Sequence, residues 1–127
     1  MFRINTTTKQ IELTRGDVAA INVTAKAEDG SDYVFLVGDI VRFKVFKNKD
    51  CGCVELQKDE EVTEQCTSVS IELTGEDNEI WELISKPVDY WYEVELNPDT
   101  NPQTIIGYDE NGAKIFTLYP EGGDKKW

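Results

Sequence analysis

Three observations predict an all-β fold for this chain. Residues 88–96 (VDYWYEVEL) alternate between apolar side chains and Asp89, Trp91, Glu93 and Glu95, the pattern of a strand with one buried face and one wet face. Similar short runs recur about every 8–12 residues, separated by turn-forming Gly, Pro, Asn and Asp. Only one short stretch has a helical pattern. We therefore expect an antiparallel β-sandwich of seven or eight strands with one short helical turn, although a closed barrel would satisfy the same strand count.

The same alternation places the other strands and their buried faces. The expected strands cover residues 11–14, 18–27, 40–47, 53–58, 66–73, 88–97, 103–108 and 113–119. The side chains expected to point inward are those of Ala19, Ile21, Val23, Ala25, Val41, Phe43, Val45, Val69, Ile71, Leu73, Val88, Tyr90, Tyr92, Val94 and Leu96. These residues would supply the core that the acidic face of residues 88–96 cannot enter, because burying carboxylates is costly.

The segments between the strands carry turn and loop signals. Arg15–Asp17 and Glu28–Gly30 are expected turns, and Asp109–Gly112, which ends in Asn-Gly, is expected to join the last two strands as a hairpin. An Arg-Gly-Asp tripeptide alone is weak evidence for integrin binding, so a tight turn is the better interpretation. Residues 59–64 are expected to form an exposed acidic loop, and residues 98–102 a polar crossover.

The helical turn is expected at residues 76–83. Thr74 can cap its start, with Asp77 three residues later, and Pro87 would end it. Residues 1–9 and 121–127 are polar and are expected to be loose tails. The whole chain, residues 1–127, is expected to be one domain, since 127 residues can bury a core without disulfides or metal.

Charge restricts the kinds of partner. The net charge is −12, and it is uneven: residues 1–58 hold nine Lys/Arg and eight Asp/Glu, whereas residues 59–127 hold four and seventeen. A surface this acidic repels phosphate backbones, so nucleic-acid binding is not expected. Solubility is the simpler explanation of the acidic half, and attraction of a basic partner surface is the alternative.

Hydropathy gives no indication of a membrane or secreted protein. No apolar run approaches the ~20 residues that cross a bilayer, and the first residues lack the apolar centre of a secretory signal. We therefore expect no membrane association and synthesis in the cytosol.

The residue types for metal binding and nucleophilic catalysis are scarce. The chain has no histidine and three cysteines, Cys51, Cys53 and Cys66, too few for a tetrahedral zinc site. A Ser or Cys nucleophile would lack its usual base. Glu93 and Glu95 could flank a glycosidic bond, but among 25 acidic residues a suitable pair occurs by chance. We expect no enzyme activity, no metal and no cofactor, and free thiols with Cys66 half-buried.

Three aromatic residues are the candidate contact residues. Phe46 and Trp91 fall on otherwise polar strand faces, and Trp127 lies in the polar C-terminal tail. Exposed aromatic side chains are enriched at binding hot spots, although single exposed apolar residues are also ordinary. We predict that these residues contribute to an interface.

The order of these features resembles a known family. The resemblance rests on Gln10–Asp17 (QIELTRGD), the Asp29-Gly30 turn, Asp39–Lys47 (DIVRFKVFK), Val69–Asp77 (VSIELTGED), Val88–Leu96 and the closing segment that ends at Tyr119-Pro120. In this order they resemble the N-terminal domain of phage baseplate upper proteins and its small stand-alone relatives in prophages of Gram-positive bacteria. The resemblance spans about residues 9–120 and includes no catalytic motif. Lys86-Pro87 stands where the family usually has Gly.

The resemblance implies a fold and a function. The implied fold is an immunoglobulin-like β-sandwich, and the implied role is a structural part of the virion tail or baseplate that docks to other tail proteins, with a homo-oligomer as a further option. The implied location is the virion, assembled in the bacterial host cytoplasm. Baseplate upper proteins continue beyond this domain, so the position in the virion is not implied. A carbohydrate-binding module for host cell-wall glycan is the alternative, with Trp91 as the stacking platform.

Overall fold

The computed structural model describes residues 2–4, 9–27, 29–47, 54–74, 77, 86–107 and 114–120. These residues contain nine strands and no helix, so the all-β prediction is confirmed. The strands are β1 (Phe2–Ile4), β2 (Ile11–Thr14), β3 (Ala19–Val23), β4 (Ile40–Phe46), β5 (Val54–Glu61), β6 (Val69–Leu73), β7 (Val88–Leu96), β8 (Gln103–Ile106) and β9 (Lys114–Tyr119). The helical turn predicted at residues 76–83 and the tail at residues 121–127 lie outside the described residues.

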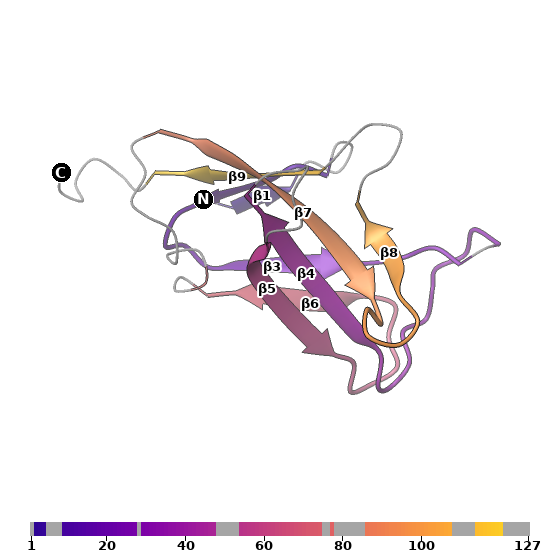
Figure 1. Cartoon of the computed structure of the whole chain (residues 1–127). Coiled ribbons are helices and arrows are strands. Elements are labelled where there is room, and N and C mark those ends of the chain that lie inside the picture. Colours follow the sequence, from indigo (N-terminus) through magenta and orange to yellow (C-terminus); the bar gives the residue numbers. More distant parts are fainter. Residues whose placement is uncertain are drawn as a thin grey trace.

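The strands form two sheets of unequal size. Seven strands make a curled mixed sheet in the order β1-β2-β9-β7-β4-β5, with β8 also paired to β7, and β3 and β6 pair as a second, two-stranded sheet (Figure 1). β7 is the longest strand and pairs with β4 along one edge and with β9 and β8 along the other. The segment with the clearest alternation is therefore central in the large sheet.

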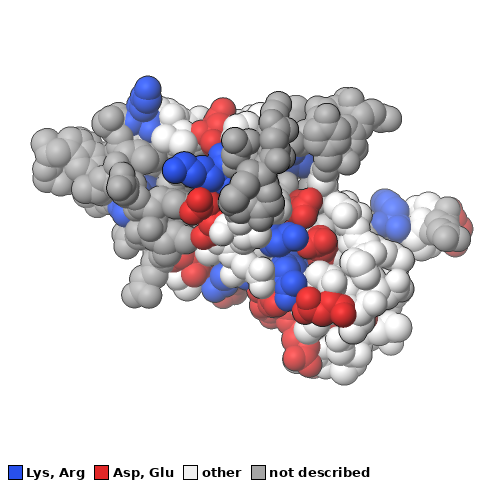
Figure 2. Space-filling view, in the orientation of Figure 1, with Lys and Arg blue, Asp and Glu red and all other residues white. Residues whose placement is uncertain are grey.

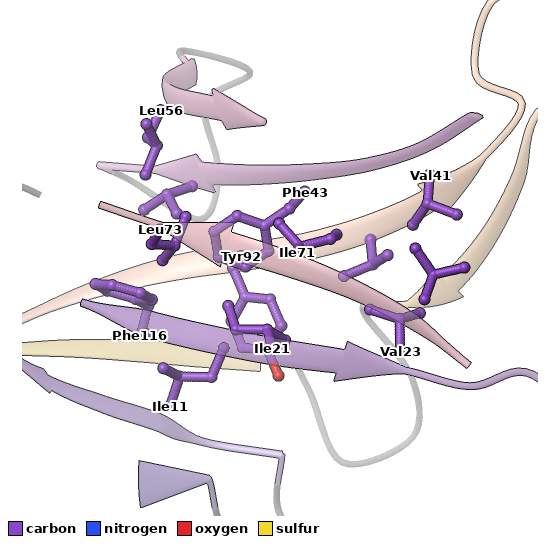
Figure 3. Close-up of a cluster of buried hydrophobic side chains, with 14 of the residues drawn as sticks. Ile11, Ile21, Val23, Val41, Phe43, Leu56, Ile71, Leu73, Tyr92 and Phe116 are labelled. Carbon is purple, nitrogen blue, oxygen red and sulfur yellow. The ribbon is translucent and has the colours of Figure 1, made fainter. Parts of the chain in front are cut away.

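The core lies between the two sheets. Buried side chains alternate with exposed or half-buried ones along β3, β4, β6 and β7, as predicted from their sequences. Figure 3 shows Ile21, Val23 and Ile71 of the small sheet facing Phe43 and Tyr92 of the large one. Each fully buried side chain of this kind contributes about 1.5–3 kcal/mol by leaving water. One continuous core therefore holds the two sheets together.

The prediction of a wholly antiparallel structure is wrong at the first long strand. β2 runs parallel to β9, with Ile11 opposite Phe116 and Leu13 opposite Leu118. All four side chains are fully buried. This register brings the apolar faces of both strands onto the core side of the sheet, which is a sufficient reason for the pairing.

The predicted hairpin between the last two strands is also wrong. β8 and β9 are both paired to β7, at opposite ends of its length, and a bulge between Val94 and Glu95 interrupts the ladder near β8. Residues 97–102 join β7 to β8 as an antiparallel pair, so they are a hairpin connection and not a crossover. Asn97 takes a left-handed conformation there, with φ of 48°. The predicted turn Asp109–Gly112 lies outside the described residues.

Two further predictions are corrected near the edges of the large sheet. Part of the expected acidic loop at residues 59–64 belongs to β5, because β4 supplies a ladder as far as the pair Ile40 and Glu61. The expected loose segment at residues 1–9 contains β1, which pairs antiparallel with β2. The predicted turns are confirmed at Gly16 and Gly30, whose φ angles of 91° and 86° suit glycine.

Candidate docking face

The outer face of the large sheet, on the side away from the core, carries the predicted contact residues. Along β4 and β7 this face presents Arg42, Lys44 and Phe46 opposite Glu95, Glu93 and Trp91, respectively. All six are half-buried. Figure 2 shows basic and acidic side chains intermixed on the side of the molecule seen in Figure 1.

An apolar row crosses this face at one end. Phe46 of β4 and Trp91 of β7 are direct cross-strand partners, Phe46 is also paired with Val54 of β5, and Trp91 with Ile115 of β9. We call these four residues the aromatic row. Val54 is 43% exposed, and the other three are half-buried. Directly opposed residues of neighbouring strands have their side chains on the same face, so the register aligns these four apolar residues in one row across four strands.

Ion pairs occupy the positions next to the row. The Lys44 Nζ lies 3.3 Å from a Glu93 carboxylate oxygen and 2.6 Å from a Glu95 oxygen. It also lies 5.6 Å from the centre of the Phe46 ring, within the range of a cation–π contact. Burial lowers the pKa of Lys44, but hydrogen bonds and the charges of Glu95 and Glu93 outweigh it, so the pKa is raised.

Farther along the face, Arg42 joins three segments. Its Nε donates to Asp59 of β5 at 2.8 Å, and one of its terminal nitrogens donates to Asp99 in the connection between β7 and β8 at 3.0 Å. Hydrogen bonds to Asp59 and then to Asp99 raise the pKa of the guanidinium above its ordinary value. The ion pairs of Arg42 and Lys44 thus hold the charged side chains on one side of the aromatic row.

This arrangement suits binding better than hydrolysis. Glu93 and Glu95 both pair with the Lys44 ammonium group, so the two carboxylates considered as a hydrolytic pair are engaged in ion pairs. An apolar strip with paired charged side chains beside it combines the apolar and polar parts of which protein interfaces are made. The outer face could therefore contact a partner through its apolar row. In the ion pairs among the described residues of this face, four carboxylates pair with two cations.

The structure brings together two of the three predicted contact residues. The sequence places Phe46 and Trp91 on polar faces, and the register of β4 and β7 makes them neighbours. Trp127 lies outside the described residues. Sequence reasoning missed Val54 and Ile115: each lies in a predicted strand, but alternation does not show which residues of separate strands stand opposite each other.

The cysteines and the possible metal ligands are also candidate functional groups. Cys66 is a free, half-buried thiol, as predicted. Cys51 and Cys53 lie outside the described residues. Within the described ranges, no three His, Cys, Asp or Glu side chains form a group that could hold a metal ion, and no helix could span a membrane.

Comparison with family models, with curated proteins and with solved structures found no significant match.

Proposed function

We propose that this protein is a non-enzymatic docking module whose outer face binds a partner protein. The observation that carries the proposal is the direct pairing of Phe46 with Trp91 at one end of the outer face of the large sheet. Aromatic side chains dominate the energy of many interfaces, and a two-residue aromatic centre, extended by Val54 and Ile115, is a suitable anchor.

The setting of this docking is a phage or prophage tail. The motifs from Gln10 to Pro120 that resemble the N-terminal domain of baseplate upper proteins support this part of the proposal. In this setting the partners are other tail or baseplate proteins, with homo-oligomer formation as a variant of the same docking, and the protein is located in the virion. Acidic residues outnumber basic ones on the outer face, which favours a partner with a basic contact surface.

The proposed fold is an immunoglobulin-like sandwich of the variable type. In that fold the strands named C′, C, F and G follow one another in one sheet, and B and E pair in the other. Here β5, β4, β7 and β9 follow one another in the large sheet, and β3 pairs with β6 in the small one. The chain order of these six strands also agrees with that assignment. β1 and β8 would be additions to it.

Co-expression with products of neighbouring genes tests the docking role. If the proposal holds, at least one neighbouring gene encodes a tail protein that co-purifies with this chain. Trp91→Ala should abolish this co-purification while leaving the melting temperature nearly unchanged. Val18→Ala is the matched control, because Val18 is an exposed apolar residue (72%) outside the aromatic row. Co-purification that survives Trp91→Ala removes the aromatic row from the proposal.

A carbohydrate-binding module is the second candidate. It is favoured by the position of Trp91 between Asp89 and Glu93 on one strand face, since a stacking ring with adjacent carboxylates suits a sugar. Titration with cell-wall polysaccharide distinguishes the two functions. Saturable binding by the wild type that Trp91→Ala abolishes would favour this candidate over protein docking.

A further inference from the structure

We propose that the protein binds an extended peptide segment in a second place, between the edges of β3 and β8, where the peptide would add a strand to both sheets. A cavity of about 750 Å³ lies there, with Ile21, Tyr92 and Leu96 among its lining residues. This volume falls within the range of ligand-binding clefts. The cavity is separate from the outer face, because Ile21 and Tyr92 belong to the core side of their sheets.

Strand edges, and not strand faces, border this cavity. Successive residues of a strand point to opposite faces, so a cavity against one face touches every second residue. Here the cavity is lined by all four residues of β8, Gln103–Ile106, and by three successive residues of β3, Ala20–Asn22. Among the described residues β8 pairs only with β7 and β3 only with β6. Both strands therefore have one edge without a strand partner among the described residues, and both line the same cavity.

The composition of these two edges differs from that of the opposite edge of the sheet. An open edge is normally protected from pairing with other chains by charged residues. β5 follows this rule, since five of its eight residues, VELQKDEE, are charged. β3 (AAINV) and β8 (QTII) contain no charged residue. Unprotected edges on both sides of a cavity are suited to strand addition.

The charges around the cavity specify the occupant further. Lys9 and Lys26 line it, and no carboxylate is found among its described lining residues, although the chain carries a net charge of −12. Asp32 pairs with Lys26 at 2.7 Å, whereas Lys9 pairs with no acidic side chain among the described residues. The occupant is therefore a short strand of four or five residues, matching β8 and β3, with apolar side chains at alternate positions and a carboxylate.

A peptide titration of the full chain tests this site. The probe is the synthetic peptide acetyl-TVEVTV-amide, and the readouts are amide chemical shifts and amide hydrogen exchange. Saturable binding with slowed exchange in β3 and β8 is the expected result. Methylating either the odd-numbered or the even-numbered backbone nitrogens of the peptide should weaken binding at least tenfold, because each set of N–H groups points to one of the two strand edges and that edge then loses the hydrogen bonds that the peptide donates to it. A cleft that binds through side chains alone would accept the methylated peptide.

Variants of the chain separate this site from the outer face. Lys9→Glu and Ala20→Glu should each weaken binding of the acidic peptide several-fold, and both positions are exposed, so the fold should be retained. Trp91→Ala, the matched control on the outer face, should bind the peptide as the wild type does. The proposal is overturned by no binding at millimolar peptide, by equal binding of the methylated peptide, or by exchange protection confined to other strands.

Discussion

Phe43 and Phe46 lie three positions apart on β4 and have opposite environments. Phe43 is fully buried and packs against Tyr92 and Phe116, with ring centres 5.6 and 6.3 Å away, whereas Phe46 is half-buried on the outer face. Phe43→Ala should lower the free energy of unfolding by about 3–5 kcal/mol, because it leaves a cavity in the core. Phe46→Ala should cost about 1 kcal/mol. Urea unfolding measures both, and equal losses would contradict the assigned faces.

Tyr92 should make stability depend on alkaline pH. Burial raises the pKa of its phenol above the ordinary 10.0, and its hydroxyl donates to the backbone carbonyl of Lys9. The unfolded chain therefore loses this proton first. The stabilisation is complete below pH 10 and is lost as pH rises from there through the folded-state pKa.

Tyr92→Phe tests this dependence by urea unfolding between pH 8 and 11.5. The variant should lose about 1 kcal/mol near neutral pH, the worth of one hydrogen bond. Its stability should then fall less steeply than that of the wild type above pH 10. The difference between the two curves isolates Tyr92 from Tyr33 and Tyr90, whose pKa values burial also raises. Parallel curves would contradict a buried, neutral phenol.

At the level of elements, Asn97 fastens the end of β7 to the start of β4. Its side-chain oxygen accepts from the Ile40 N–H at 2.9 Å, and its amide group donates to Asp39 at 3.2 Å. Its φ of 48° is left-handed, a region that Asn and Gly tolerate better than other residues. Asn97→Gly should lose only the hydrogen bonds. Asn97→Ala should be less stable than Asn97→Gly by about 1 kcal/mol, and the reverse order in urea unfolding would refute this account.

The faces of the strands could be predicted from the sequence, but their pairing could not. Alternation identifies which side chains of β4 and β7 are buried, because the period of a strand is local. The partner of β2 depends on the fit of Ile11 and Leu13 against Phe116 and Leu118 across more than 100 residues, and no local pattern contains that fit. The Asn-Gly turn signal likewise predicted a hairpin between the last two strands, whereas β8 and β9 each pair with β7 instead of with each other.

The candidate site was predictable to a similar extent. Phe46 and Trp91 are recognisable as aromatic residues on polar faces, since each interrupts a charged alternation. Their cross-strand pairing, the addition of Val54 and Ile115, and the shared Lys44 ion pair with Glu93 and Glu95 all follow from register. The cavity between β3 and β8 could be predicted only if it were known which strands lie at the edges of each sheet. The sequence of a single strand does not show this.

For the whole molecule, two sheets enclose one core and leave an outer face with an aromatic row at one end and paired charged side chains beside it. The core determines the register of β4 and β7, and that register places Phe46 beside Trp91. Stability and the proposed docking are thus linked through the same two strands. Substitutions on the outer face should therefore change binding much more than folding, whereas core substitutions should change both.

The central claim is that Phe46 and Trp91 act as one contact. Calorimetric titration of the co-purifying partner against the wild type, Phe46→Ala, Trp91→Ala and the double variant tests it most directly. Each single substitution should raise the Kd at least tenfold, and the double substitution should raise it by less than the product of the two, because adjacent residues share their contacts. A Kd that none of the three variants changes would contradict the claim.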